Sequence, residues 1–351
     1  MRVERIVPVE PIDQQRVAGL DGAILTRDLA IGQQRWRKGR VLSAADIHQL
    51  SQAVTAFERP VTLLMPGPGE LHEDQAALRL AAAVAGSGLE QRGPNESRVD
   101  LHAARDGVLH VRVAALERVD RIDPLEVFTR FDGQVVAAGD LVASVKVAPH
   151  VVDASLVERA VALSGAHGLV RVAAFRRRTV GVLVKQALHG PARDRFEASV
   201  RQKVEALGSV LGSRIYVADL AAPVEAALRA MTAPSGGVDL VLTAGSASTD
   251  PLDPFYIAID ALGGSVIRHG VPAHPGSMLW LARVGRTDVI GLPTCGAYSR
   301  ATAADLLLPR LLSGERASAR TVARLGHGGI LAREMRFRMP PYARDLPAED
   351  V

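Results

Sequence analysis

The chain has 351 residues, of which 48% are hydrophobic and 4% aromatic, and its formal net charge is +4. This length predicts two or three domains, with cores built from Val, Leu, Ala and Ile. The basic residues are scattered and lack interleaved aromatic side chains, which argues against nucleic acid as a partner. Nearly all of them are Arg, because Lys occurs only at positions 38, 146, 185 and 203. A GC-rich genome explains this bias, and a surface for anions is the functional alternative.

The single cysteine, Cys295, cannot form a disulfide framework or a zinc site by itself. The first residues lack an apolar signal core. No stretch reaches the roughly 18 apolar residues that a membrane helix needs. We therefore expect a cytoplasmic protein with no membrane segment.

The N-terminal part of the chain mixes helical and extended patterns. We expect an α+β region over 1–95, with a helix at 44–53, a buried strand at 61–65 and a helix at 73–85. Residues 96–175 predict a β-rich region, since alternating patterns indicate strands at 98–103, 107–113 and 141–147.

From residue 176 to residue 316 strands and helices alternate. The patterns predict strands at 179–184, 213–217, 238–242, 265–269, 277–283 and 288–292, and helices at 194–207, 222–231, 254–262 and 301–312. Such alternation predicts an α/β domain, a mostly parallel sheet with helices on both faces. The Arg- and Pro-rich segment 317–351 is expected either to wrap back or to stay loose.

The most informative segment runs from Val238 to Asp253. An aliphatic strand passes into a loop of small residues that includes Gly245, Ser246 and Ser248. Loops of this kind between a strand and a helix cradle phosphate with backbone N–H groups and hydroxyls. The alternative is an ordinary tight turn whose serines cap the next helix.

Asp250 and Asp253 place two carboxylates beside this loop. Carboxylates next to a phosphate suit Mg2+, so both residues are candidate metal ligands and candidate catalytic residues. Alternatively, both lie at a helix start, where the helix dipole favours negative charge.

Two further features are expected at the same edge of the sheet. Lys185 follows the first strand of the domain and could neutralise a phosphate, or could be an exposed lysine. The loop after the last strand contains Gly291, Pro293, Thr294, Cys295 and Gly296. Loops at the carboxyl ends of neighbouring parallel strands share one crevice, so we expect these residues to contact the ligand.

Several ordered segments carry a resemblance to a known family: Asp239–Gly245, Leu262–Gly276 with its Pro-Gly pair, and Val289–Gly296. Over about residues 178–315 the chain resembles the molybdopterin-binding domain of molybdenum-cofactor biosynthesis proteins. The resemblance loosely implies self-association, and it implies that the bound molecule is molybdopterin. We expect residues of three loops and one lysine to bind it. These residues are Thr243, Ala244, Gly245, Ser246, Ala247, Ser248, Pro275, Gly276, Gly291, Pro293, Thr294, Cys295, Gly296 and Lys185.

The chain also departs from this family. Molybdotransferases carry an acidic Thr-Gly-Asp-Glu type of loop where this chain has residues 185–190, Lys-Gln-Ala-Leu-His-Gly. Binding of a pterin phosphate is therefore better supported than catalysis, and two hypotheses stay open. One is an enzyme resembling a molybdotransferase or a molybdopterin adenylyltransferase. The other is a non-catalytic carrier or sensor that presents molybdopterin, or its nucleotide form, to a molybdoenzyme or a cofactor nucleotidyltransferase.

Overall fold

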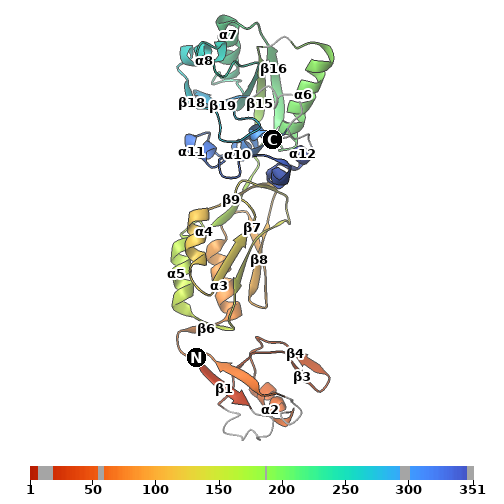
Figure 1. The fold of residues 1–351 in the computed structure, drawn as a ribbon, viewed down its shortest axis with the longest axis vertical. Helices are drawn as coiled ribbons and strands as arrows, with labels where there is room; N and C mark the ends of the chain where they lie inside the picture. The colour runs from red at the N-terminus through yellow and green to blue at the C-terminus, as the bar shows by residue number, and fades with distance from the viewer. Residues whose placement is uncertain (7–18, 54–58, 186–187, 293–300, 346–351) are drawn as a thin grey trace. The chain divides into compact units, whose positions relative to one another are not determined.

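The computed structural model describes residues 1–6, 19–53, 59–185, 188–292 and 301–345 (Figure 1). The chain forms two compact units. The first contains residues 1–104, 111–130 and 138–171, and the second contains residues 105–110, 131–137 and 172–351. Every helix in the described part of the chain is too short or too polar to cross a membrane.

The first unit begins with a small antiparallel sheet in the order β1, β5, β2. Its elements and their neighbours are β1 (Arg2–Ile6), β2 (Ile24–Leu25), the β3 (Leu29–Ile31) and β4 (Gln34–Trp36) hairpin, α2 (Ala44–Ala53) and β5 (Val61–Met65). Trp36, Ile47 and Leu50 are buried together in one core, so α2 packs through its apolar face. The predicted helix at 44–53 and strand at 61–65 are confirmed to the residue.

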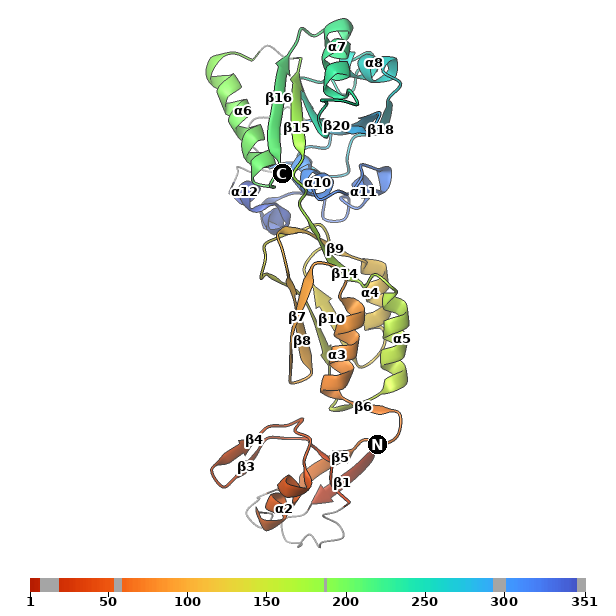
Figure 2. The same ribbon diagram turned by 180° about the vertical axis from the view of Figure 1, so that it is seen from behind.

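The rest of this unit is built around a four-stranded antiparallel sheet in the order β10, β12, β8, β7. The elements are β6 (Glu70–His72), α3 (Glu73–Val84), β7 (Leu89–Asn95), β8 (Arg98–Ala103), α4 (Val113–Asp120), β10 (Leu125–Thr129), β12 (Leu141–Val147), β13 (Val151–Asp153) and α5 (Ala154–Ser164). Strands β6 and β13 pair with each other. Helix α5 packs against both α3 and α4, as Figure 2 shows from behind.

The prediction of a β-rich region over 96–175 is only partly confirmed, because α4 and α5 lie within it. The strand expected to run to residue 113 ends at Val111, and α4 begins at Val113. The boundary expected near residue 95 falls in the turn between β7 and β8, whose strands pair. Three more strands, β9 (Gly107–Val111), β11 (Val135–Val136) and β14 (Val170–Ala174), form a separate small sheet.

The second unit is built on a six-stranded sheet in the order β16, β15, β17, β20, β19, β18 (Figure 1). The strands are β15 (Thr179–Val184), β16 (Val210–Tyr216), β17 (Leu240–Ala244), β18 (Ser265–His269), β19 (Trp280–Val284) and β20 (Thr287–Gly291). Neighbouring strands from β16 to β20 are parallel, and β19 is antiparallel to both of its neighbours. The predicted mostly parallel α/β sheet is confirmed.

Helices cover both faces of this sheet. The four helices are α6 (Gly190–Glu205), α7 (Ala221–Met231), α8 (Pro254–Ala261) and α10 (Ala303–Leu312). Val180 and Val182 of β15 share a core with α6 and α10, whereas Leu183 shares a core with α7 and α8. Successive residues of a strand point to opposite faces, so a run of apolar residues buries both sides.

The C-terminal segment of the second unit packs onto its core as far as residue 345. It contains α11 (Ala319–Ala323), the 3-10 helix η2 (Arg333–Arg338) and α12 (Pro341–Arg344). Leu325, Leu331 and Met339 are buried in the core that α6 and α10 share. Of the two outcomes expected for this segment, the described residues show the one in which it wraps back.

Candidate functional site

The strand order creates a switch point between β15 and β17. The chain leaves β15, forms β16 on one side, and then returns to form β17 on the other side. The last residues of β15 and β17, Val184 and Ala244, are paired, and the N–H of Lys185 donates to the carbonyl of Ala244 at 3.2 Å. Lys185 and Gly245 therefore emerge side by side at the carboxyl edge. Ligands of open α/β sheets bind at such a point.

The loop after β17 presents unused hydrogen-bond donors. Gly245 has a φ of +90°, a conformation that favours glycine, and it turns the chain out of the sheet. The backbone N–H groups of Ser246, Ser248 and Thr249 have no acceptor among the described residues. The hydroxyl of Ser248 has no partner there either. Closely spaced free N–H groups in a loop are the means by which proteins bind phosphate.

Asp253 fixes the shape of this loop. Its side chain is buried, and its Oδ2 accepts a 2.6 Å hydrogen bond from the N–H of Ala247. Its Oδ1 accepts from the N–H of Phe255 at 2.9 Å, so Asp253 is the N-cap of α8. Because this cap already occupies the N-terminus of α8, the free donors for a ligand belong to the loop and not to the helix.

Lys185 compensates the buried charge of Asp253. Its Nζ lies 3.0 Å from Oδ2 of Asp253 and 2.6 Å from Oδ1 of Asp219, and its side chain is 2% exposed. Burial alone would lower the pKa of Lys185. The hydrogen bonds to Asp219 and Asp253 outweigh this effect and hold its pKa above the ordinary value. The side chain is therefore a buried ammonium group beside the loop and not an exposed lysine, and its contact with a phosphate stays a prediction.

The two candidate metal ligands have different surroundings. Asp250 is exposed, and its Oδ1 accepts from the N–H of Leu252 at 2.9 Å. Both oxygens of Asp253 already accept hydrogen bonds, and a cation bound there would have to displace the ammonium group of Lys185. The residues present therefore do not fit a magnesium ion shared by these two carboxylates without rearrangement, and the metal assignment stays a prediction.

Two aromatic residues that the sequence analysis did not single out form hydrogen bonds with the loop after β17. Nε1 of Trp280 donates to Oγ of Ser246 at 3.0 Å, and the hydroxyl of Tyr256 donates to the carbonyl of Ser248 at 3.1 Å. The two rings lie edge to face, with centroids 5.3 Å apart. Side chains of β19 and α8 therefore fix the position of the loop. Within the described residues they leave the N–H groups of Ser246, Ser248 and Thr249 available to a ligand.

The same tyrosine gives a pH-dependent prediction. Burial, with a further contribution from the charge of Asp253, raises the pKa of Tyr256 from 10.0 to about 12. A raised pKa means that the folded state binds the proton more tightly. The resulting stability is complete below pH 10.0 and is lost as the pH rises to about 12. Urea unfolding across this window should therefore show a smaller loss of stability for Tyr256→Phe than for the wild type, and equal losses would contradict the assignment.

The Pro-Gly pair lies beside α10. The carbonyl of Pro275 accepts from the N–H of Ala303 at 2.9 Å. Gly276 has a φ of +105°, and a Cβ at this position would lie 2.8 Å from the backbone nitrogen of Ala303. No hydrogen bond in the described structure joins either residue to the loop after β17, so their predicted contact with a ligand stays a prediction.

The loop after β20 is described only at its start. Gly291 pairs with Trp280, and a Cβ at Gly291 would lie 2.0 Å from the indole ring, so glycine leaves room for the ring. The N–H of Leu292 donates to the carbonyl of Thr243 at 2.9 Å, which brings the start of this loop to the end of β17. Four predicted ligand-contact residues lie outside the described residues: Pro293, Thr294, Cys295 and Gly296.

A parallel α/β sheet with a clamped small-residue loop at its switch point defines a candidate phosphate-binding domain. Residues 179–313 match the model of a family described as a probable molybdopterin binding domain. This match confirms the predicted resemblance, and it covers the strands and loops that form the site.

Comparison with curated proteins finds no match. Among solved structures, the chain is similar to the molybdopterin biosynthesis protein MoeA from Pyrococcus horikosii, with 17% identity over 73% of this chain and 81% of that one, at a TM-score of 0.27. A deletion mutant of NadC shows 13% identity over 53% and 79% of the two chains, at a TM-score of 0.16. Both scores are too low to establish a shared overall fold.

Proposed function

We propose that this protein binds molybdopterin during the synthesis or delivery of the molybdenum cofactor, with the pterin phosphate held by the Gly245–Ser248 loop. The observation that carries this proposal is that the N–H groups of Ser246, Ser248 and Thr249, at the switch point, have no acceptor in the part of the chain that the structure describes. The family match over residues 179–313 supports molybdopterin as the bound molecule.

The charge at the site supports an anionic ligand. The ammonium group of Lys185 has three N–H donors, and Asp219 and Asp253 accept from it. Asp219 is 61% exposed, so water competes for it. A phosphate can take the place of Asp219 as an acceptor for Lys185, while the buried Asp253 continues to hold the loop.

Binding of molybdopterin with and without its phosphate tests the proposal. Loss of the phosphate should weaken binding on the order of tenfold or more, because charge-assisted hydrogen bonds to N–H groups and to an ammonium group are lost. Ser248→Ala should weaken binding by about three- to tenfold, since one hydroxyl donor is removed. Isothermal titration calorimetry measures both effects.

Ser265→Ala is the matched control, because Ser265 is exposed on β18 and its hydroxyl has no hydrogen-bond partner among the described residues. This variant should bind molybdopterin like the wild type. Equal affinity for the phosphorylated and dephosphorylated ligands would contradict the proposed place of the phosphate.

A non-catalytic carrier is the second candidate function. The hydrogen bonds and the ion pair that Asp253 already makes favour it. Both oxygens of this carboxylate accept hydrogen bonds, and Lys185 compensates its charge, so it is poorly placed to act as a general base or as a metal ligand. A turnover assay with molybdopterin, ATP, molybdate and Mg2+ separates the candidates. Stoichiometric binding without formation or release of AMP supports the carrier, and multiple turnovers support the enzyme.

A further inference from the structure

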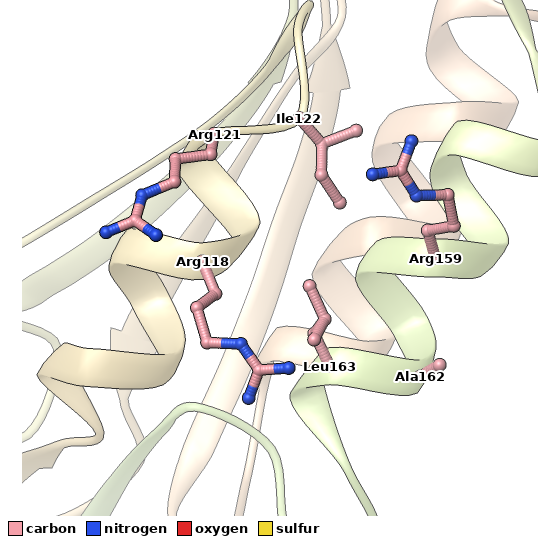
Figure 3. Close-up of a pocket in the computed structure, with 6 residues that line it drawn as sticks. All are labelled: Arg118, Arg121, Ile122, Arg159, Ala162 and Leu163. Atoms are coloured by element: carbon pink, nitrogen blue, oxygen red, sulfur yellow. The ribbon is translucent and has the colours of Figure 1, made fainter.

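A second basic site lies in the first unit, apart from the residues that the proposed function uses. A cavity of about 530 Å3 opens between α4 and α5 and is lined by Arg118, Arg121, Ile122, Arg159, Ala162 and Leu163 (Figure 3). Pockets for small ligands commonly measure about 300–1,000 Å3. The cavity is therefore large enough for a small organic molecule, and it is much larger than a single phosphate ion needs.

None of the three arginines has an acidic partner within the described part of the chain. Figure 3 shows Arg118 extending from α4 toward Leu163 and Arg159 extending from α5 toward Ile122, whereas the guanidinium group of Arg121 turns away from α5. Arg118 and Arg159 thus reach into the space between the helices from opposite sides. A guanidinium group can bind a phosphate through paired N–H donors.

Two of the neighbouring carboxylates interact with other groups. Asp120, in the last turn of α4, accepts from the N–H of Val127 at 2.8 Å. Glu158, next to Arg159 in the chain, lies 3.4 Å from Arg79. Other arginines of this unit pair with carboxylates, as Arg98 does with Asp100 at 2.7 Å. Glu117 and Asp123 also lie close in the sequence, but within the described residues neither forms an ion pair with the three arginines.

A structural role explains only part of this arrangement. Basic residues at the end of a helix interact favourably with its dipole, which accounts for Arg118 and Arg121 at the end of α4. Arg159 lies in the middle of α5, where the helix dipole gives no such stabilisation. The floor between these charges is apolar, since Ile122 is 3% exposed and Leu163 is partly buried.

From this combination we propose that the cavity binds a phosphorylated small molecule. Its phosphate groups contact Arg118 and Arg159, and its apolar or aromatic body lies on Ile122, Ala162 and Leu163. A guanidinium plane can also stack on a ring of the ligand. A nucleoside diphosphate combines both features, and ADP is therefore a suitable probe.

Calorimetric titration of the full-length protein with ADP tests this site. Wild-type protein should bind ADP, and Arg118→Ala and Arg159→Ala should each weaken binding on the order of tenfold, with a smaller effect for Arg121→Ala. All three side chains are exposed, so the variants should keep the fold. Arg92→Ala, an exposed arginine on β7 of the same unit, is the control and should bind like the wild type.

Three results would contradict the proposal. They are the absence of ADP binding, equal affinity for adenosine and ADP, and ADP binding that survives Arg118→Ala and Arg159→Ala together. Ser248→Ala distinguishes this site from the proposed molybdopterin site, since this variant should leave ADP binding at the arginines unchanged. Loss of ADP binding in Ser248→Ala alone would place the nucleotide at the loop after β17 and would also contradict the second site.

Discussion

Replacing Lys185 with methionine should lower the free energy of unfolding by about 3–5 kcal/mol, because a buried carboxylate loses its charged partner. Asp253 is 1% exposed, so water cannot replace the ammonium group that lies 3.0 Å from its Oδ2. Methionine keeps the apolar stem of the lysine and is only one atom shorter, so the change removes mainly the charge. Urea unfolding of the two proteins at neutral pH measures the difference.

Two further variants separate this effect from a general loss of packing. Asp219→Asn should cost less than about 1 kcal/mol, because the side chain of Asp219 is 61% exposed and exposed ion pairs contribute little. The double variant Lys185→Met with Asp253→Asn should recover much of the lost stability, since asparagine is neutral and still caps a helix. A double variant no more stable than Lys185→Met would show that the charge of Asp253 is not the cause.

Replacing Gly291 with alanine should destabilise the protein by about 1–3 kcal/mol, as overpacking of a close-fitting core does. The new Cβ would lie 2.0 Å from the indole ring of Trp280, so the ring must move. Trp280 holds Oγ of Ser246 by a 3.0 Å hydrogen bond, and movement of the ring releases one side of the loop. We therefore expect weaker binding of molybdopterin together with the loss of stability.

Gly326→Ala is the matched control in the same unit. A Cβ at Gly326 would meet its nearest neighbours at 3.5 Å, which is ordinary van der Waals contact, and its φ is not in the left-handed region. This variant should retain the stability and ligand affinity of the wild type. If Gly291→Ala binds molybdopterin as tightly as Gly326→Ala does, Trp280 is not needed to position the loop.

Much of the second unit could be predicted from its apolar runs. Residues 179–184 were predicted to the residue, because runs of β-branched and aliphatic side chains are typical of strands. The helix α4 was missed because it has only eight residues and directly follows a buried strand. In so short a segment the helical spacing of apolar residues cannot be distinguished from the end of the strand.

Only those parts of the site that form a recognisable local pattern in the sequence could be predicted. The small-residue loop after β17 and the lysine after β15 stand out in the sequence, and the structure brings them together. The roles of Asp219, Trp280 and Tyr256 depend on the order of the strands and on the antiparallel direction of β19. Local sequence patterns carry no information on strand order, so the sequence did not indicate that these three side chains belong to the site.

The chemical shifts of three backbone amides test the central claim most directly. During titration with molybdopterin, the N–H signals of Ser246, Ser248 and Thr249 should move together and saturate with the ligand, because these groups donate to the phosphate. Titration with pyrophosphate should move the same signals. Saturable binding of molybdopterin that leaves all three amide signals in place would contradict the account.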